Sequence, residues 1–137
     1  MNYLELKNSH AEELNNFPNA FAFSKSQFDE AMVNLGLTPS DTDKVCTVFG
    51  GGIIKKTDSK ALNELFNRHH SERKGAMKSS DDYLVEMFSY ELANHEYGYT
   101  MELDSTLEAL SLTIEEVNAD KRLLKALHTA ISQVNFD

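Results

Sequence analysis

This 137-residue chain lacks the features that mark secreted and membrane-spanning proteins. Its one cysteine, Cys46, cannot form an internal disulfide, so a reduced, cytosolic setting is expected. No apolar run approaches the roughly 18 residues of a membrane span. Met1–Lys7 has no basic segment followed by an apolar stretch, so it does not resemble a secretory signal. We therefore expect no membrane partner.

Basic residues are also scarce. The chain has 13 Lys and Arg against 22 Asp and Glu, a formal net charge of -9. Nucleic acids and anionic lipids are bound through excess positive charge, so direct binding to nucleic acid is not expected. An acidic surface favours solubility or a basic partner. The length and the 41% hydrophobic content suit one core, and we predict a single domain over residues 1–137.

The sequence predicts a predominantly helical α+β protein with about five helices. Helix starts are indicated where Ser or Thr is followed three residues later by Glu or Gln, because each side chain can then bond the other residue's backbone N–H. Three pairs fit this pattern: Ser9–Glu12, Ser24–Gln27 and Thr113–Glu116. They predict a first helix ending near Asn16, a second ended by Gly36, and a last helix reaching about Val134.

Two further helices are expected in the middle of the chain. One begins at Thr57–Ser59 and frays near Gly75, and the next begins after Ser79 or Ser80 and ends at Gly98. Before them, residues 45–55 predict a β-hairpin, since β-branched residues flank three consecutive glycines that permit a tight turn. Two strands alone are marginal, so a third is expected from the N-terminus or from Phe21–Phe23.

The central helix carries polar groups where apolar ones are expected. At about 100° per residue, Glu91, Asn94 and His95 fall within the arc of the apolar side chains. Those apolar side chains are Leu84, Val85, Met87, Phe88 and Leu92. Burying a carboxylate or an imidazole without a partner costs several kcal/mol. Glu91 and His95 are therefore expected to be a hydrogen-bonded structural pair, to bind an ion, or to line a cleft.

A metal site is one alternative for this pair. If the two middle helices form an antiparallel hairpin, His69 lies opposite Glu91, and His69, Glu91 and His95 together have the composition of a zinc site. A buried hydrogen-bonded pair explains the same residues without a metal. No recognisable nucleophile accompanies them, so a Glu–His acid–base role has little support. We expect no cofactor, with a divalent metal as the alternative.

Surface acids and aromatic residues near the central helix are candidates for binding a partner. The acidic candidates are Asp81, Asp82, Glu86 and Glu96. Tyr97 and Tyr99 flank Gly98, where aromatic rings can either seal the core or form a binding hot spot. Both uses of the tyrosines remain open from the sequence.

Three segments together resemble a small family of uncharacterised proteins found in bacteriophages and other mobile elements of bacteria. They are DTDKV, GGGIIKK, and ELANHEYGYT followed by TLEALSLTIEEV, and the resemblance covers most of the chain after Phe21. It implies no catalytic residue. It does imply a context, the bacterial host cell, in which small acidic proteins often bind and block a host nuclease or other defence factor.

Three functional hypotheses follow. The leading one is a non-enzymatic acidic binding protein that inhibits or modulates a host defence or nucleic-acid-handling protein. The second is a metal-dependent enzyme or metal-stabilised domain using His69, Glu91 and His95. The third is an assembly protein that forms a homodimer through its last helix, although the apolar spacing there breaks at Asp120 and favours docking onto the core.

Overall fold

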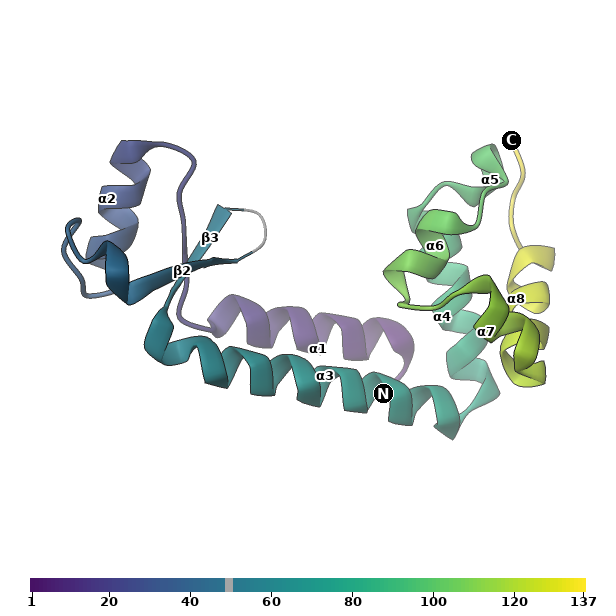
Figure 1. Cartoon of the computed structure of the whole chain (residues 1–137). Helices are drawn as coiled ribbons and strands as arrows, with labels where there is room; N and C mark the ends of the chain where they lie inside the picture. The colour runs from purple at the N-terminus through teal and green to yellow at the C-terminus, as the bar shows by residue number, and fades with distance from the viewer. Residues whose placement is uncertain (49–50) are drawn as a thin grey trace. The chain divides into compact units, whose positions relative to one another are not determined.

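The computed structural model describes residues 1–48 and 51–137, and it is predominantly helical with a small antiparallel sheet, as predicted (Figure 1). The helices are α1 (Tyr3–Asn16), α2 (Lys25–Asn34), α3 (Ser59–Ser79), α4 (Asp81–Asn94), α5 (Tyr97–Thr100), α6 (Asp104–Ala109), α7 (Ile114–Ala119) and α8 (Lys121–Ser132). The strands are β1 (Ala20–Phe21), β2 (Val45–Val48) and β3 (Gly52–Lys55). Within these described residues, no helix combines the length and apolar composition needed to cross a bilayer.

The chain divides into two compact units. Met1–Ser9 and Glu72–Asp137 form the first, which we call the helical unit, and His10–Ser71 form the second, which we call the mixed unit. Helices α1 and α3 each contribute residues to both units. Because these helices are continuous across the division, it does not decide the number of domains, and the single domain stays a prediction.

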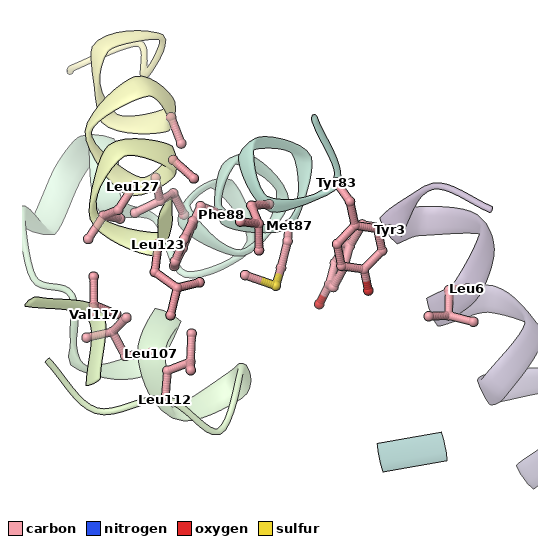
Figure 2. Close-up of a cluster of buried hydrophobic side chains, with 14 residues drawn as sticks. Tyr3, Leu6, Tyr83, Met87, Phe88, Leu107, Leu112, Val117, Leu123 and Leu127 are labelled. Carbon is pink, nitrogen blue, oxygen red and sulfur yellow. The ribbon is translucent and has the colours of Figure 1, made fainter. Parts of the chain in front are cut away.

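The helical unit is organised around α4, which packs chiefly on α8. Leu84, Phe88 and Leu92 of α4 are at most 1% exposed, as the helical repeat predicted. Figure 2 shows Phe88 facing Leu123 and Leu127 of α8. Asn94 had been placed in the same arc but is exposed, because α4 ends at this residue and its last turn leaves the core.

The mixed unit contains the sheet, in the order β1-β3-β2. The predicted hairpin is confirmed as antiparallel pairing of β2 with β3, although Phe49 and Gly50 lie outside the described residues. The third strand comes from the start of the predicted Phe21–Phe23 segment, since β1 pairs with β3. The core cluster of this unit is small and consists of Ala31, Leu35 and Ile53, and Met32, Ile54 and Leu62 are buried as well.

Two predicted helix boundaries, the start of α1 and the end of α3, were wrong. Helix α1 begins at Tyr3 rather than Ser9, because the Asn2 side chain accepts a hydrogen bond from Glu5 N and the Glu5 side chain accepts one from Asn2 N. Helix α3 continues through Gly75 to Ser79. A single glycine costs a helix only about 1 kcal/mol, which packing of the long helix offsets.

Two boundaries in the second half also differ from prediction. Helix α4 starts after Ser80 as predicted, but it ends at Asn94 rather than at Gly98. Glu96, two residues later, takes a left-handed conformation with φ 56°. The Thr113–Glu116 capping box is present but opens the short α7. The last helix is split because the Asp120 carboxylate accepts hydrogen bonds from Arg122 N and Leu123 N and so begins α8.

Candidate functional site

The Glu91 carboxylate lies in the core of the helical unit and is compensated by donors from α1. Its residue is 1% exposed. The Tyr3 hydroxyl donates a hydrogen bond to Glu91 Oε1 over 3.0 Å, and Lys7 Nζ donates to the same oxygen over 3.0 Å. An ionised donor makes such a bond roughly twice as strong as a neutral one. The N-terminal part of α1 is thus held to α4 by a buried polar contact.

The second oxygen of this carboxylate faces His95. The His95 Nε2 atom lies 3.4 Å from Glu91 Oε2, but the geometry is not that of a hydrogen bond, and both atoms are buried without a hydrogen-bond partner among the described residues. The His95 side chain is 27% exposed. The side chains of Glu91 and His95, one helical turn apart, therefore lie next to each other without a hydrogen bond. The hydrogen bonds to the Glu91 carboxylate come from Tyr3 and Lys7.

Aromatic rings surround the Glu91 contact. The Tyr3 ring meets Tyr83 edge-on and Tyr90 at a tilt, each with 5.7 Å between centroids, and Figure 2 shows the first pair. Lys7 Nζ lies 5.4 Å from the Tyr90 ring centre, within cation–π range. Burial and the neighbouring Glu91 carboxylate raise the pKa of Tyr3, so its hydroxyl remains protonated and acts as the donor.

His69 lies in the mixed unit and contacts a different set of side chains. Its ring stacks on His10, with 3.8 Å between centroids, and the two residues are 1% and 6% exposed. His69 Nε2 is 3.3 Å from Glu13 Oε1, and Arg68 pairs with the other Glu13 oxygen. Burial, followed by the neighbouring His10, lowers the pKa of His69, and the hydrogen bond from Arg68 lowers the pKa of Glu13.

The three proposed metal ligands belong to two different sets of contacts, one in each unit. Glu91 adjoins His95, whereas His69 contacts His10 and Glu13. Over residues 1–48 and 51–137, no group of three or more His, Cys, Asp or Glu side chains is arranged to hold a metal ion. The arrangement around Glu91 supports structural linkage of α1 to α4, since lysine and tyrosine occupy the positions beside its first oxygen.

Acidic residues are concentrated in one part of the helical unit. The 40 residues from Asp81 to Asp120 contain eleven Asp and Glu and no Lys or Arg. Nine of the eleven are exposed, Glu86 is half-buried, and Glu91 is buried. The helical unit as a whole carries fourteen acidic and seven basic residues, a net charge of -7, against -2 for the mixed unit.

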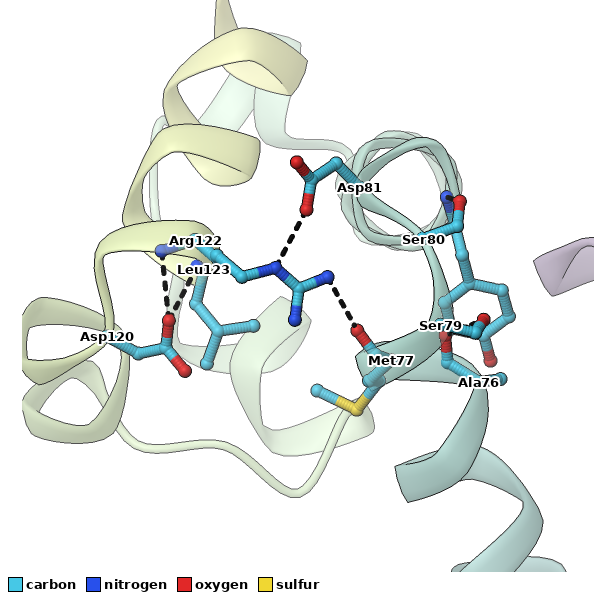
Figure 3. A network of polar contacts seen from close by, with 9 residues as sticks. Ala76, Met77, Ser79, Ser80, Asp81, Asp120, Arg122 and Leu123 are labelled. Carbon is cyan, nitrogen blue, oxygen red and sulfur yellow. Dashed lines mark hydrogen bonds and ion pairs between the residues drawn. The ribbon is translucent and has the colours of Figure 1, made fainter.

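The four acids proposed to bind a partner have different surroundings. Asp82 and Glu96 are exposed. Asp81 accepts a hydrogen bond from Arg122 Nε over 2.8 Å, and Arg122 also donates to the Met77 carbonyl over 3.1 Å (Figure 3). Glu86 accepts a hydrogen bond from Leu4 N over 3.1 Å and so caps the first turn of α1. Two of the four carboxylates are therefore engaged within the protein.

The two predicted partner-binding tyrosines take different positions. Tyr97 is half-buried and meets the Phe136 ring edge-on, with 6.0 Å between centroids. Tyr99 is 77% exposed. Tyr97 thus seals the core edge, while Tyr99 presents its ring to solvent.

Sequence reasoning missed Tyr3 and Lys7, which make the hydrogen bonds to Glu91. Tyr3 and Lys7 are four residues apart and so share one face of α1, but that spacing does not identify α4 as the element they contact. Tyr3 and Lys7 lie 88 and 84 positions, respectively, from Glu91 in the chain.

Comparison with known proteins places the chain in a family. It has no significant match among curated proteins and none among solved structures. A family model matches residues 2–133, nearly the whole chain. The protein belongs to this family, which is described as a family of unknown function (DUF7659).

Proposed function

We propose that this protein is a non-enzymatic acidic binding protein of a phage or other mobile element, which inhibits or modulates a defence or nucleic-acid-handling protein in the cytoplasm of its bacterial host. The observation that carries the proposal is the segregation of charge. Eleven acidic residues and no Lys or Arg lie between Asp81 and Asp120, and nine of those carboxylates are exposed.

Such a surface suits a basic partner. Proteins that handle nucleic acids bind phosphates through Lys and Arg, so an acidic face can occupy the same basic surface. Like charges would reject acidic proteins and nucleic acid itself. Among the proposed binding residues, Asp82, Glu96 and Tyr99 are exposed, and an exposed tyrosine ring beside carboxylates has the composition of an interface anchor.

Capture from a bacterial host lysate with the immobilised full chain tests the proposal. Bound proteins are identified, and the captured partner is purified so that its affinity and its activity can be measured. We expect a basic defence or nucleic-acid-handling protein whose activity falls on binding and whose affinity weakens between low and physiological salt. A partner of another class, or binding that salt does not change, would contradict the proposal.

Matched charge variants show which acids matter. The test variant is Glu102→Gln, Glu108→Gln and Glu115→Gln in the helical unit, and the control is Glu12→Gln, Glu30→Gln and Asp43→Asn in the mixed unit; all six residues are exposed. Each exposed ion pair contributes about 0.5 kcal/mol, so the test variant should bind the partner about tenfold more weakly. The control should bind within about twofold of the wild type. Equal losses would mean that overall charge, rather than the helical unit, governs binding.

The metal hypothesis is separated from this proposal by elemental analysis of protein purified without chelator. A binding protein of the proposed kind should contain less than about a tenth of an equivalent of any transition metal, and added zinc should not shift its melting temperature. Stoichiometric zinc would favour the alternative of a metal-dependent enzyme or metal-stabilised domain.

A further inference from the structure

A groove lies where the C-terminal end of α4 meets α5, the end of α8 and residues 133–137. All of its lining residues belong to the helical unit, and its volume is about 720 Å³. This falls within the 300–1,000 Å³ range typical of ligand sites. Leu92, Ala93, Ala130 and Val134 supply the apolar part of the lining.

The polar part of the lining is rich in hydrogen-bond acceptors. Glu96 and Asp137 line the groove, and no Lys, Arg or His is among its lining residues in the described part of the chain. Ser89 also lines it, and the buried Ser89 hydroxyl has no hydrogen-bond partner within the described chain. Tyr99 adds an aromatic ring that is 77% exposed. These groups complement a cation with several N–H donors and an apolar stem.

A second groove shows that this charge pattern is not general to the unit. That groove, of about 390 Å³, is lined by Lys74, Lys78 and Arg122 together with Glu116 and Asp120. Its mixed charges provide no net attraction for a cation. Of these two grooves of the helical unit, the one beside Glu96 thus has no Lys, Arg or His among its described lining residues, whereas the other has three basic residues.

Backbone contacts hold the walls of the Glu96 groove in place. Asp137 N donates a hydrogen bond to the Gly98 carbonyl over 3.1 Å, and a Cβ added at Gly98 would overlap the Asn135 carbonyl. Glu96 occupies the left-handed region, where a non-glycine residue is uncommon and carries strain. The backbone of Glu96 is thus held at the groove in a conformation that the surrounding packing maintains.

We infer that this groove receives an arginine side chain from a basic segment of the partner protein. The inference rests on the proposed function and locates the partner contact. The aliphatic stem of the arginine lies along the apolar lining, its guanidinium pairs with Glu96 and Asp137, and the Tyr99 ring stacks on it.

Fluorescence anisotropy with the full-length chain and a labelled nonapeptide carrying three arginines tests this inference at low salt. The groove variant is Glu96→Gln with Asp137→Asn. The control is Glu12→Gln with Asp43→Asn, which makes the same charge change at exposed residues of the mixed unit, outside the groove lining. We expect the groove variant to weaken binding about tenfold and the control at most about twofold.

Tyr99→Leu provides a second variant, and it should fold normally because Tyr99 is 77% exposed. A loss of binding in this variant can therefore be attributed to the missing aromatic ring. Loss of the stacked ring should weaken peptide binding about threefold while the far-ultraviolet circular dichroism stays unchanged. A lysine version of the peptide should bind less tightly than the arginine version, since lysine cannot form the planar, bidentate contact.

Three results would overturn the inference. Equal weakening by the groove and control pairs would mean that the peptide binds the acidic surface at large, and spermidine competing as well as the peptide would indicate a polyamine site. No binding of the peptide by the wild type would also reject the groove. The proposed function is judged separately, since capture and inhibition of a natural partner do not depend on this peptide.

Discussion

The helical unit and the mixed unit place ionisable groups in their interiors by different means. In the helical unit the Glu91 carboxylate receives hydrogen bonds from Tyr3 and Lys7. In the mixed unit His69 stacks on His10, and its lowered pKa keeps its imidazole neutral. A buried charge is thus compensated in one unit, and a buried ionisable group is left uncharged in the other.

The units differ as much in their cores and surfaces. The core cluster of the helical unit contains fourteen buried apolar residues, whereas the described part of the mixed unit has six buried apolar residues, three of them in one cluster. The helical unit also carries a net charge of -7, whereas the mixed unit carries -2. A large core can hold a strongly acidic surface together against its own repulsion, and this makes the helical unit the natural place for a charged binding face.

The largest expected effect concerns the two cores. Phe88→Ala, at a site 0% exposed in the helical unit, should lower the free energy of unfolding by about 4 kcal/mol through lost burial and the cavity it leaves. Ile53→Ala in the mixed unit should cost about 3 kcal/mol because that core is smaller. Urea denaturation followed by circular dichroism measures both. The control Phe23→Ala, 78% exposed, should change stability by less than about 0.5 kcal/mol.

Removing one hydroxyl from the Glu91 contact should have the next largest effect. Tyr3→Phe keeps the ring packing but leaves the buried carboxylate with one donor fewer, and should cost about 2 kcal/mol in unfolding free energy. Tyr99→Phe, at an exposed tyrosine, is the matched control and should be nearly neutral. If both variants unfold at the same urea concentration, the hydroxyl of Tyr3 does not compensate Glu91.

Acidification should weaken the mixed unit through His69. The pKa of His69 in the folded protein lies below its ordinary value of 6.5, so the unfolded chain binds a proton at a higher pH than the folded protein does. The contribution of neutral His69 to stability is therefore fully present above about pH 6.5 and is lost as the pH falls below that value. Unfolding curves between pH 7.5 and 5.5 measure this decline. His69→Phe retains an aromatic ring without a titrating group and should flatten the decline. An unchanged pH dependence in that variant would assign it to other groups.

The surface ion pair of the helical unit should matter least. Asp81→Ala removes the carboxylate that accepts the Arg122 hydrogen bond, but the Asp81 side chain is 74% exposed and solvent screens the pair. The free energy of unfolding should fall by about 0.5 kcal/mol, and Asp82→Ala should be close to neutral. A loss beyond about 1.5 kcal/mol would mean that the network in Figure 3 holds α8 to α4 more strongly than screening allows.

Much of the fold could be predicted from local sequence. Capping residues Ser24, Ser80 and Thr113 marked true helix starts, and the apolar repeat identified the buried face of α4, Glu91 included. The hairpin followed from β-branched residues around the glycines. These features succeed because caps, repeats and turns act over a few residues.

The rest depended on contacts between distant residues. The spacing within α4 showed that Glu91 needed a partner, but nothing in it pointed to Tyr3 and Lys7 on α1. Gly98 was expected to end α4, yet the left-handed turn falls at Glu96, and Gly98 instead allows the chain near Asn135 to approach closely. The groove is formed by that approach, and no local pattern indicates it.

The central claim is that the helical unit, at its acidic groove, is the part of the protein that binds a basic partner. Titration of the ¹⁵N-labelled full chain with the arginine nonapeptide, followed by two-dimensional NMR, tests it most directly. The account predicts that the largest amide shifts fall in residues 89–99 and 133–137 and that the amides of His10–Ser71 stay nearly unchanged. Largest shifts within His10–Ser71 would contradict it.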